Sequence, residues 1–181
     1  DGNNFDLLTS SAGTHTWAVT GVNHTGEIHN LDTARAVLKD AVANGQLPVE
    51  SDVINFNEIG NTGEFGSSTG FPGVSGNHFV ILAKAQIYID TAGEYTFGTN
   101  ADDGVELWVD QHRAIYDDSK HPAQNRFGTV ELAVGIHDIK VMFFEATGGA
   151  NLEVFWAKGV QAGLSISDFT LLKSITGKPA P

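Results

Sequence analysis

The sequence predicts an all-β fold, an antiparallel β-sandwich in a single domain with one or two short helices. Many short segments of alternating apolar and polar residues follow one another at even spacing, which is typical of a sandwich. The chain has 21 glycines and only 5 prolines, a composition that suits many turns between short strands. Its 181 residues suffice for a sizeable core, and no segment repeats at a fixed period. We place the domain at residues 1–176 and interpret residues 177–181 as a linker tail.

The first part of the chain predicts two strands and a long loop. Residues 17–22 and 53–56 are short, mostly apolar runs of strand length. Residues 60–76 are rich in glycine, serine and threonine, which predicts a loop that connects the second strand to the rest of the sandwich.

Between these two strands, residues 31–45 have helical periodicity. We expect Asp32 to cap the N-terminus of this helix and Gly45 to end it. The apolar residues recur every three or four positions and form one face, so the helix should cover a sheet edge or the bottom of the sandwich. The residues of this apolar face are Leu31, Ala34, Leu38, Ala41 and Val42.

The second part of the chain consists of closely spaced strands. Alternating apolar positions mark each strand, and glycine or polar residues mark the turns. Residues 117–128 and 145–151 are polar or glycine-containing and predict two longer loops. The expected strands cover residues 79–83, 86–90, 95–99, 105–109, 114–116, 130–134, 139–143, 152–156 and 165–173.

Composition removes several classes of function. A net charge of −12 argues against nucleic acid and anionic membranes as partners, because proteins bind both with basic patches. The chain has no cysteine, so disulfides, thiol nucleophiles and thiolate metal sites are excluded. No apolar run approaches the roughly 18 residues of a membrane-spanning helix. The first residues do not resemble a signal peptide, and we expect a module of a longer, extracellular, multidomain chain.

The adjacent acids Asp102 and Asp103 stand out at the end of one predicted strand. Neighbouring side chains of a strand point to opposite faces, whereas two carboxylates that converge need a positive charge between them. Ca²⁺ is the natural ion for a site built from oxygen ligands alone. Asp102-Asp103-Gly104 is also a common turn sequence, and a plain turn is the alternative interpretation. Asp117 and Asp118 allow two interpretations as well, a second cation site or a solvated loop.

Residues 93–156 resemble the protective-antigen-type β-sandwich domain, named for a domain of anthrax toxin. The resemblance rests on the ordered segments 93–97, 102–110, 130–137 and 148–156, whereas residues 1–75 match weakly. Some members of this family are toxin pieces or non-catalytic modules of glycosidases. Others, including yeast flocculins, epithelial adhesins and modules of large bacterial adhesins, are Ca²⁺-dependent lectins.

In the lectin group, a pair of aspartates joined by a cis peptide coordinates Ca²⁺, and sugar hydroxyls complete the shell of the ion. The resemblance implies this role for Asp102 and Asp103. It also implies that the loop at residues 145–152 supplies the other ligands, although Asn151 follows the glycines, so the spacing of the yeast members is not reproduced. The expected metal ligands are Asp102, Asp103, the carbonyls of Thr147 and Gly149, and Asn151, and the expected sugar contacts are Asp102, Asp103, Gly148 and Asn151.

These inferences predict a Ca²⁺-dependent lectin module of a bacterial surface adhesin that binds vicinal hydroxyls of cell-surface glycans or monosaccharides. The alternative is a structural or protein-interaction module in which Ca²⁺ only stabilises loops. We expect no catalysis, because adjacent aspartates on one ion do not flank a glycosidic bond. The chain also lacks a nucleophile-elbow motif in a serine–histidine–aspartate order. Trp108 and Trp156 are expected in the core or on a sheet face, rather than as platforms for sugar rings.

Overall fold

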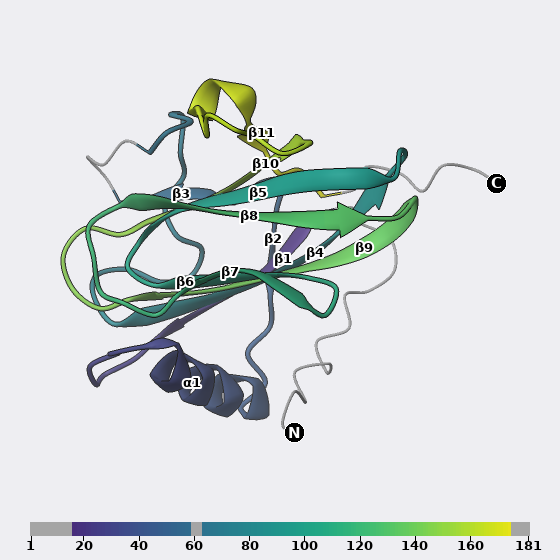
Figure 1. Ribbon diagram of the computed structural model, residues 1–181. Helices are drawn as coiled ribbons and strands as arrows, with labels where there is room; N and C mark the ends of the chain where they lie inside the picture. Colours follow the sequence, from purple (N-terminus) through teal and green to yellow (C-terminus); the bar gives the residue numbers. More distant parts are fainter. Residues whose placement is uncertain (1–15, 59–62, 175–181) are drawn as a thin grey trace.

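The computed structural model describes residues 16–58 and 63–174, and the predicted tail at 177–181 lies outside them. Figure 1 shows two β-sheets packed face to face, with one helix against the outer face of the lower sheet. All strand pairs within the two sheets are antiparallel, which confirms the predicted sandwich. No helix among the described residues is long and apolar enough to cross a membrane.

The lower sheet has six strands in the order β2-β1-β4-β9-β6-β7. The upper sheet has the order β11-β10-β5-β8, and β3 pairs with β10 beside this path. The strands of the lower sheet are β1 (Trp17–Asn23), β2 (Val49–Ser51), β4 (Phe79–Ile89), β6 (Val105–Val109), β7 (His112–Asp117) and β9 (Gly135–Glu145). Those of the upper sheet are β3 (Asn55–Asn57), β5 (Gly93–Asp102), β8 (Gln124–Leu132), β10 (Asn151–Lys158) and β11 (Thr170–Leu171).

Three predicted boundaries were wrong. The two strands expected at 79–83 and 86–90 are the single strand β4, because Lys84 and Ala85 stay in register with Lys140 and Ile139 of β9. The loop expected at 117–128 ends early, since β8 begins at Gln124 and its polar residues pair with β5. The strand expected at 165–173 is a 3₁₀ turn, η1 (Ile166–Asp168), followed by the two-residue strand β11.

The helix α1 (Leu31–Ala43) begins one residue earlier than its predicted cap. The side chain of Asn30 caps it by accepting from the Thr33 amide at 2.9 Å, so Asp32 lies in the first turn instead. There its carboxylate contacts Arg35 at 2.6 Å. Gly45, with φ of +81°, follows the last turn as expected.

The position of the helix corrects another expectation. It covers the outer face of the lower sheet, not an edge or the bottom (Figure 1). The reason is that β4 and β9 carry apolar residues on both faces. The inner residues fill the core between the sheets, and the outer ones form a second cluster with the helix. That second cluster includes Leu31, Ala34 and Leu38 of the helix with Val80, Leu82, Met142 and Phe144 of the sheet.

Candidate calcium and sugar site

The paired aspartates lie where the chain crosses from the upper sheet to the lower one. Asp102 is the last residue of β5, and Asp103 stands in the turn before β6. The peptide bond between them is cis, as the resemblance implies. A side chain at Gly104 would place its Cβ 2.3 Å from the ring of Phe144, so only glycine lets this turn pack against β9.

A third carboxylate joins the pair. Carboxylate oxygens of Asp102, Asp103 and Glu145 lie within 4.8 Å of one another. Glu145 is the last residue of β9, whereas the sequence pattern predicts it only as the start of a loop. Its signal in the sequence is weak, since it is simply the first acid after the apolar run 141–144.

Electrostatics make this acidic cluster unfavourable without a cation. Glu145 is fully buried, and neither of its carboxylate oxygens has a hydrogen-bond partner among the described residues. Burial and the charges of Asp103 and Asp102 raise the pKa of Glu145 to about 9. Burial and the charge of Asp103 raise the pKa of Asp102 to about 6. A bound cation would remove both the repulsion and the unpaired buried acceptors.

Asp103 connects the surrounding loops. One of its carboxylate oxygens accepts from the His121 amide at 2.9 Å, and the other accepts from the Ala146 amide at 2.8 Å. The first amide belongs to the loop between β7 and β8, and the second to the loop between β9 and β10. The carboxylate of Asp103 therefore holds two loops at the same end of the sandwich.

Two buried amides complete the polar surroundings. Asn151 lies directly opposite Asp102 in the pairing of β10 with β5, and opposite Asn57 in the pairing with β3. The side-chain amide of Asn151 donates to the Asn100 carbonyl at 3.1 Å. The Oδ1 atoms of Asn151 and Asn57 are buried and have no hydrogen-bond donor in the described part of the chain. Amide oxygens are ligands that Ca²⁺ accepts, so the residues present fit a hard cation.

The loop between β9 and β10, which contains Gly148 and Gly149, forms the outer rim of the site. Thr147 and Gly148 are exposed, and Gly149 is half-buried. The Gly148 amide donates to Oδ1 of Asn77 at 3.2 Å, and its φ of +112° lies in the region that favours glycine. Ligation by the carbonyls of Thr147 and Gly149 stays a prediction, as does the sugar contact of Gly148.

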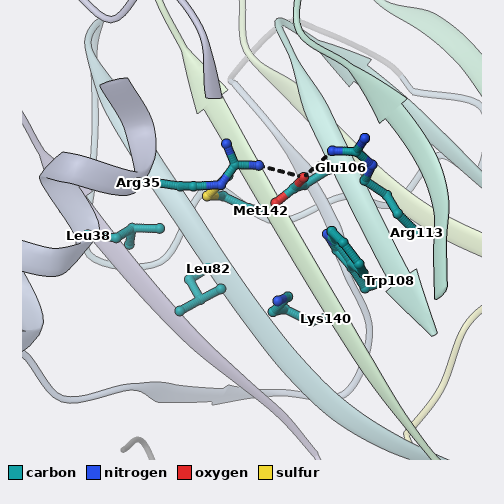
Figure 2. A pocket seen from close by; sticks show the side chains of 8 residues that line it. All are labelled: Arg35, Leu38, Leu82, Glu106, Trp108, Arg113, Lys140 and Met142. Atoms are coloured by element: carbon teal, nitrogen blue, oxygen red, sulfur yellow. Dashed lines mark hydrogen bonds and ion pairs between the residues drawn. The ribbon is translucent and has the colours of Figure 1, made fainter. Parts of the chain in front are cut away.

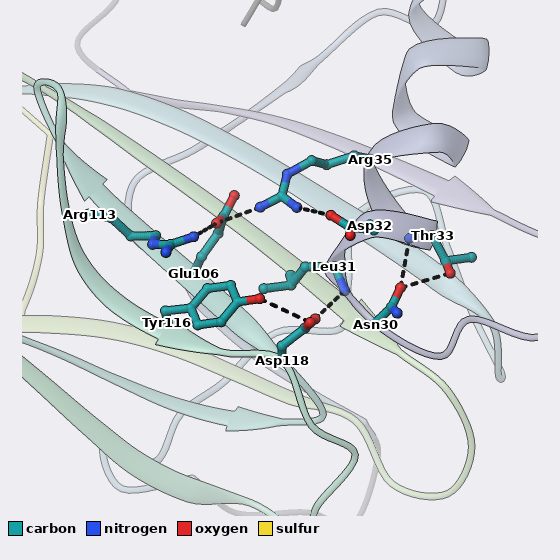
Figure 3. Close-up of polar contacts among 9 residues, drawn as sticks. All are labelled: Asn30, Leu31, Asp32, Thr33, Arg35, Glu106, Arg113, Tyr116 and Asp118. Carbon is teal, nitrogen blue, oxygen red and sulfur yellow. Dashed lines mark hydrogen bonds and ion pairs between the residues drawn. The ribbon is translucent and has the colours of Figure 1, made fainter. Parts of the chain in front are cut away.

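Asp117 and Asp118 have protein partners instead of a free cation-binding face. Asp117 is buried and contacts the Arg126 guanidinium at 2.7 Å and the Ser119 hydroxyl at 2.5 Å. Asp118 accepts from the Leu31 amide at 2.5 Å and from the Tyr116 hydroxyl at 3.0 Å, as Figure 3 shows. These two acids therefore fix the β7–β8 loop to its neighbours.

The two tryptophans lie on sheet faces. Trp108 is on the outer face of the lower sheet, where it lines a pocket together with Arg35 and Leu38 of the helix (Figure 2). Trp156 stacks on Tyr95, with ring centroids 5.6 Å apart, and packs against the core between the sheets. Neither belongs to the acidic cluster.

Comparison with known proteins agrees with this architecture. A family model described as the PA14 domain matches residues 36–169. Comparison of the sequence with curated proteins found no match.

Solved structures with the same fold include domains from three kinds of protein. The PA14 sugar-binding domain from an RTX adhesin has 13% identity and a TM-score of 0.66, over 91% of this chain and 100% of that one. The PA14 domain of the MpAFP antifreeze protein has the same identity and TM-score, over 91% and 92%. A subtype-switched epithelial adhesin A domain from Candida glabrata, in complex with β-lactose, has 9% identity and a TM-score of 0.53, over 91% and 90%. At these identities the likeness shows the fold alone.

Proposed function

The chain belongs to the PA14 domain family, and from this premise we propose that it is a Ca²⁺-dependent carbohydrate-binding module of a bacterial surface adhesin. The observation that carries the proposal is the convergence of Asp102, Asp103 and Glu145, with both oxygens of Glu145 buried and unpaired. The sugar-binding domains among the similar structures support the choice of ligand class.

The three carboxylates would hold the ion together with loop oxygens. Asp102, Asp103 and Glu145 supply the charge, and Asn151 with the carbonyls of the 147–149 loop supplies neutral oxygens. Ca²⁺ bound there would offer its remaining coordination positions to two neighbouring hydroxyls of a sugar ring.

The exposure of the acids favours different roles for them. Asp103 and Glu145 are buried, whereas Asp102 is partly exposed. Asp102 is therefore the carboxylate that a sugar hydroxyl can reach and donate to, in a hydrogen bond strengthened by charge. Asp103 orients the two loops that frame the site.

Selectivity among sugars would come from the rim. The loop that contains Gly148 and the loop between β7 and β8 both meet the acidic cluster, since Asp103 accepts from an amide of each. A shallow single site of this kind binds weakly, so adhesion would depend on several copies acting together. This fits an extracellular module within a longer chain that attaches to cell-surface glycans.

A second candidate is a non-catalytic structural module in which Ca²⁺ only stabilises loops. The two backbone hydrogen bonds of Asp103 favour it, since they already tie the loops to the acidic cluster. Both candidates require the ion, but only the first requires sugar binding. We propose no catalysis, because the carboxylates converge on one point instead of flanking a bond from two sides.

Asp102→Asn tests the proposal, with Asp90→Asn as the control. Both changes remove one negative charge, but Asp90 is an exposed turn residue between β4 and β5. Retention of the purified proteins on a panel of immobilised monosaccharides is measured in Ca²⁺ and in chelator. We expect wild type and Asp90→Asn to be retained only in Ca²⁺, and Asp102→Asn to be retained in neither. Wild-type retention that persists in chelator would contradict the mechanism, and no retention on any sugar would favour the structural module.

A further inference from the structure

A pocket lies on the outer face of the lower sheet, beside helix α1. It has a volume of about 240 Å³ and contains none of the residues of the acidic cluster. Side chains from the helix and from β4, β6, β7 and β9 line it (Figure 2). Typical ligand pockets are somewhat larger, so this one suits a small molecule.

Positive charge gathers in this pocket although the whole chain is strongly acidic. Arg35 of the helix, Arg113 of β7 and Lys140 of β9 line it, against the single carboxylate of Glu106. Arg35 is already paired, with Glu106 at 2.8 Å and with Asp32 at 2.6 Å (Figure 3). With Asp32 counted beside Glu106, three cations face two carboxylates, so one positive charge remains in excess at this point of a chain with net charge −12.

Two of the cations have no carboxylate of the described residues within hydrogen-bond distance. Arg113 stands 3.7 Å from Glu106, which is an ion-pair distance but too long for a hydrogen bond. Lys140 has no ion pair with any described residue, and its ammonium group lies 5.0 Å from the ring centroid of Trp108. The donors of Arg113 and Lys140 are therefore available to an anion.

Aromatic rings hold these donors in place. The Arg113 guanidinium lies 4.0 Å from the ring centroid of Tyr116 and 5.5 Å from that of Trp108. The indole N–H of Trp108 is buried and has no acceptor in the described part of the chain. Buried donors normally have a partner, so this atom is a second, independent sign of a missing acceptor.

The remaining wall of the pocket is apolar. Leu38 of the helix, Leu82 of β4 and Met142 of β9 form it. A bare inorganic anion would leave this wall uncovered, whereas a carbon skeleton would bury it. The pocket therefore combines a cationic side with a surface for a small organic body.

We propose that this pocket binds a small organic carboxylate. Its carboxylate group would accept from Arg113 and Lys140, and its body would lie against Leu38, Leu82 and Met142. The site is independent of Ca²⁺ and of the sugar-binding role proposed above, because the two sites share no residue.

Nuclear magnetic resonance of the indole N–H groups tests the proposal. D-Glucuronate and benzoate are the acid probes, and D-glucose and benzyl alcohol are their neutral counterparts. Ca²⁺ is removed on a chelating resin, because a dissolved chelator is itself a polycarboxylate. The chain has 3 tryptophans, and Trp108→Phe assigns the relevant signal by its disappearance. We expect at least one acid probe to shift the Trp108 signal saturably, with weaker binding at high salt, and the neutral probes to leave it unchanged.

Lys140→Met removes the charge but keeps a long apolar side chain against Trp108, and it should weaken acid binding about tenfold. Lys39→Met is the control, since Lys39 is an exposed lysine of helix α1 outside the pocket. If Lys140→Met does not fold, Arg113→Gln on the edge strand β7 is measured in its place.

The proposal is overturned if neither acid shifts the signal, if the neutral probes shift it equally, or if Lys140→Met binds like wild type. Asp102→Asn should bind the acids normally, so failure here and failure of the calcium site are separable.

Discussion

Replacing Glu145 by glutamine should have opposite effects on stability with and without Ca²⁺. In the ion-free protein the pKa of Glu145 is about 9, against an ordinary value of 4.5. The unfolded chain releases this proton above pH about 4.5, whereas the fold retains it up to about 9, so ion-free stability falls as pH rises between these values. From pH 4.5 to pH 7 is about 2.5 pH units, and each unit lowers the free energy of unfolding by about 1.4 kcal/mol. The ion-free protein therefore loses about 3 kcal/mol of stability at pH 7.

Glutamine avoids this cost because it does not ionise in either state. We therefore expect Glu145→Gln to raise the free energy of unfolding of the ion-free protein at pH 7 by up to about 3 kcal/mol. For a domain of this size the melting temperature should rise by up to about 6–12 °C. In saturating Ca²⁺ the order should reverse, since wild type gains the binding energy of the ion and the variant loses one charged ligand.

Thermal unfolding of both proteins, in chelator and across a Ca²⁺ titration, measures the reversal. Glu153→Gln is the matched control, because Glu153 is equally buried but accepts from the Glu64 and Phe65 amides at 2.8 and 3.1 Å. Burial also raises the pKa of Glu153, but Glu153 lies outside the acidic cluster, so its replacement should leave the Ca²⁺ response unchanged. If Glu145→Gln destabilised the ion-free protein, or gained as much from Ca²⁺ as wild type, the assignment of Glu145 to the ion site would be refuted.

Two further predictions concern regions away from the acidic cluster. Asn30→Ala should lower the free energy of unfolding by about 1 kcal/mol in chemical denaturation, because it removes the side chain that caps the helix. Asn44→Ala at the other end of the helix is the control and should have little effect, since only the backbone of Asn44 caps. Burial lowers the pKa of His137, but hydrogen bonds to the Asp110 carboxylate at 2.8 Å and to the Ala133 carbonyl raise this pKa above 6.5 overall. The stability that the His137–Asp110 pair contributes is therefore complete below pH about 6.5 and is lost as pH rises through the folded pKa. Asp110→Asn should therefore destabilise the protein more at about pH 5.5 than at about pH 8.5, by less than about 1 kcal/mol because Asp110 is half exposed, and an effect independent of pH would contradict this.

The sequence predicted the sandwich and the aspartate pair because both depend on local patterns. Alternation within each strand places its apolar residues, and the order of segments between 93 and 156 carries the family resemblance. The helix cap was misplaced because Asn30 and Asp32 are both good caps, and only the hydrogen bond to Thr33 decides between them.

The sequence did not predict that Glu145 and Asn57 belong to the candidate site, because their positions there depend on contacts between distant parts of the chain. Glu145 lies near Asp102 and Asp103 because β9 pairs with β4 and β6 in the lower sheet. Asn57 faces Asn151 only because the three-residue strand β3 pairs with β10. No spacing within the sequence reports either contact.

The sequence could not predict the pocket beside the helix, for the same reason. Its cations come from α1, β7 and β9, which are far apart along the chain. Both faces of β4 and β9 are apolar, which signals that something covers the outer face. This apolar pattern does not indicate that a pocket lined by Arg35, Arg113 and Lys140 remains beside the helix.

We propose that a Ca²⁺ ion bound by the acidic cluster takes part in sugar binding. A glycan array probed with the wild-type protein, once in Ca²⁺ and once in chelator, tests this role. We predict a defined set of bound glycans that share accessible vicinal hydroxyls and that all disappear in chelator. The same glycans bound equally in chelator would contradict the claim.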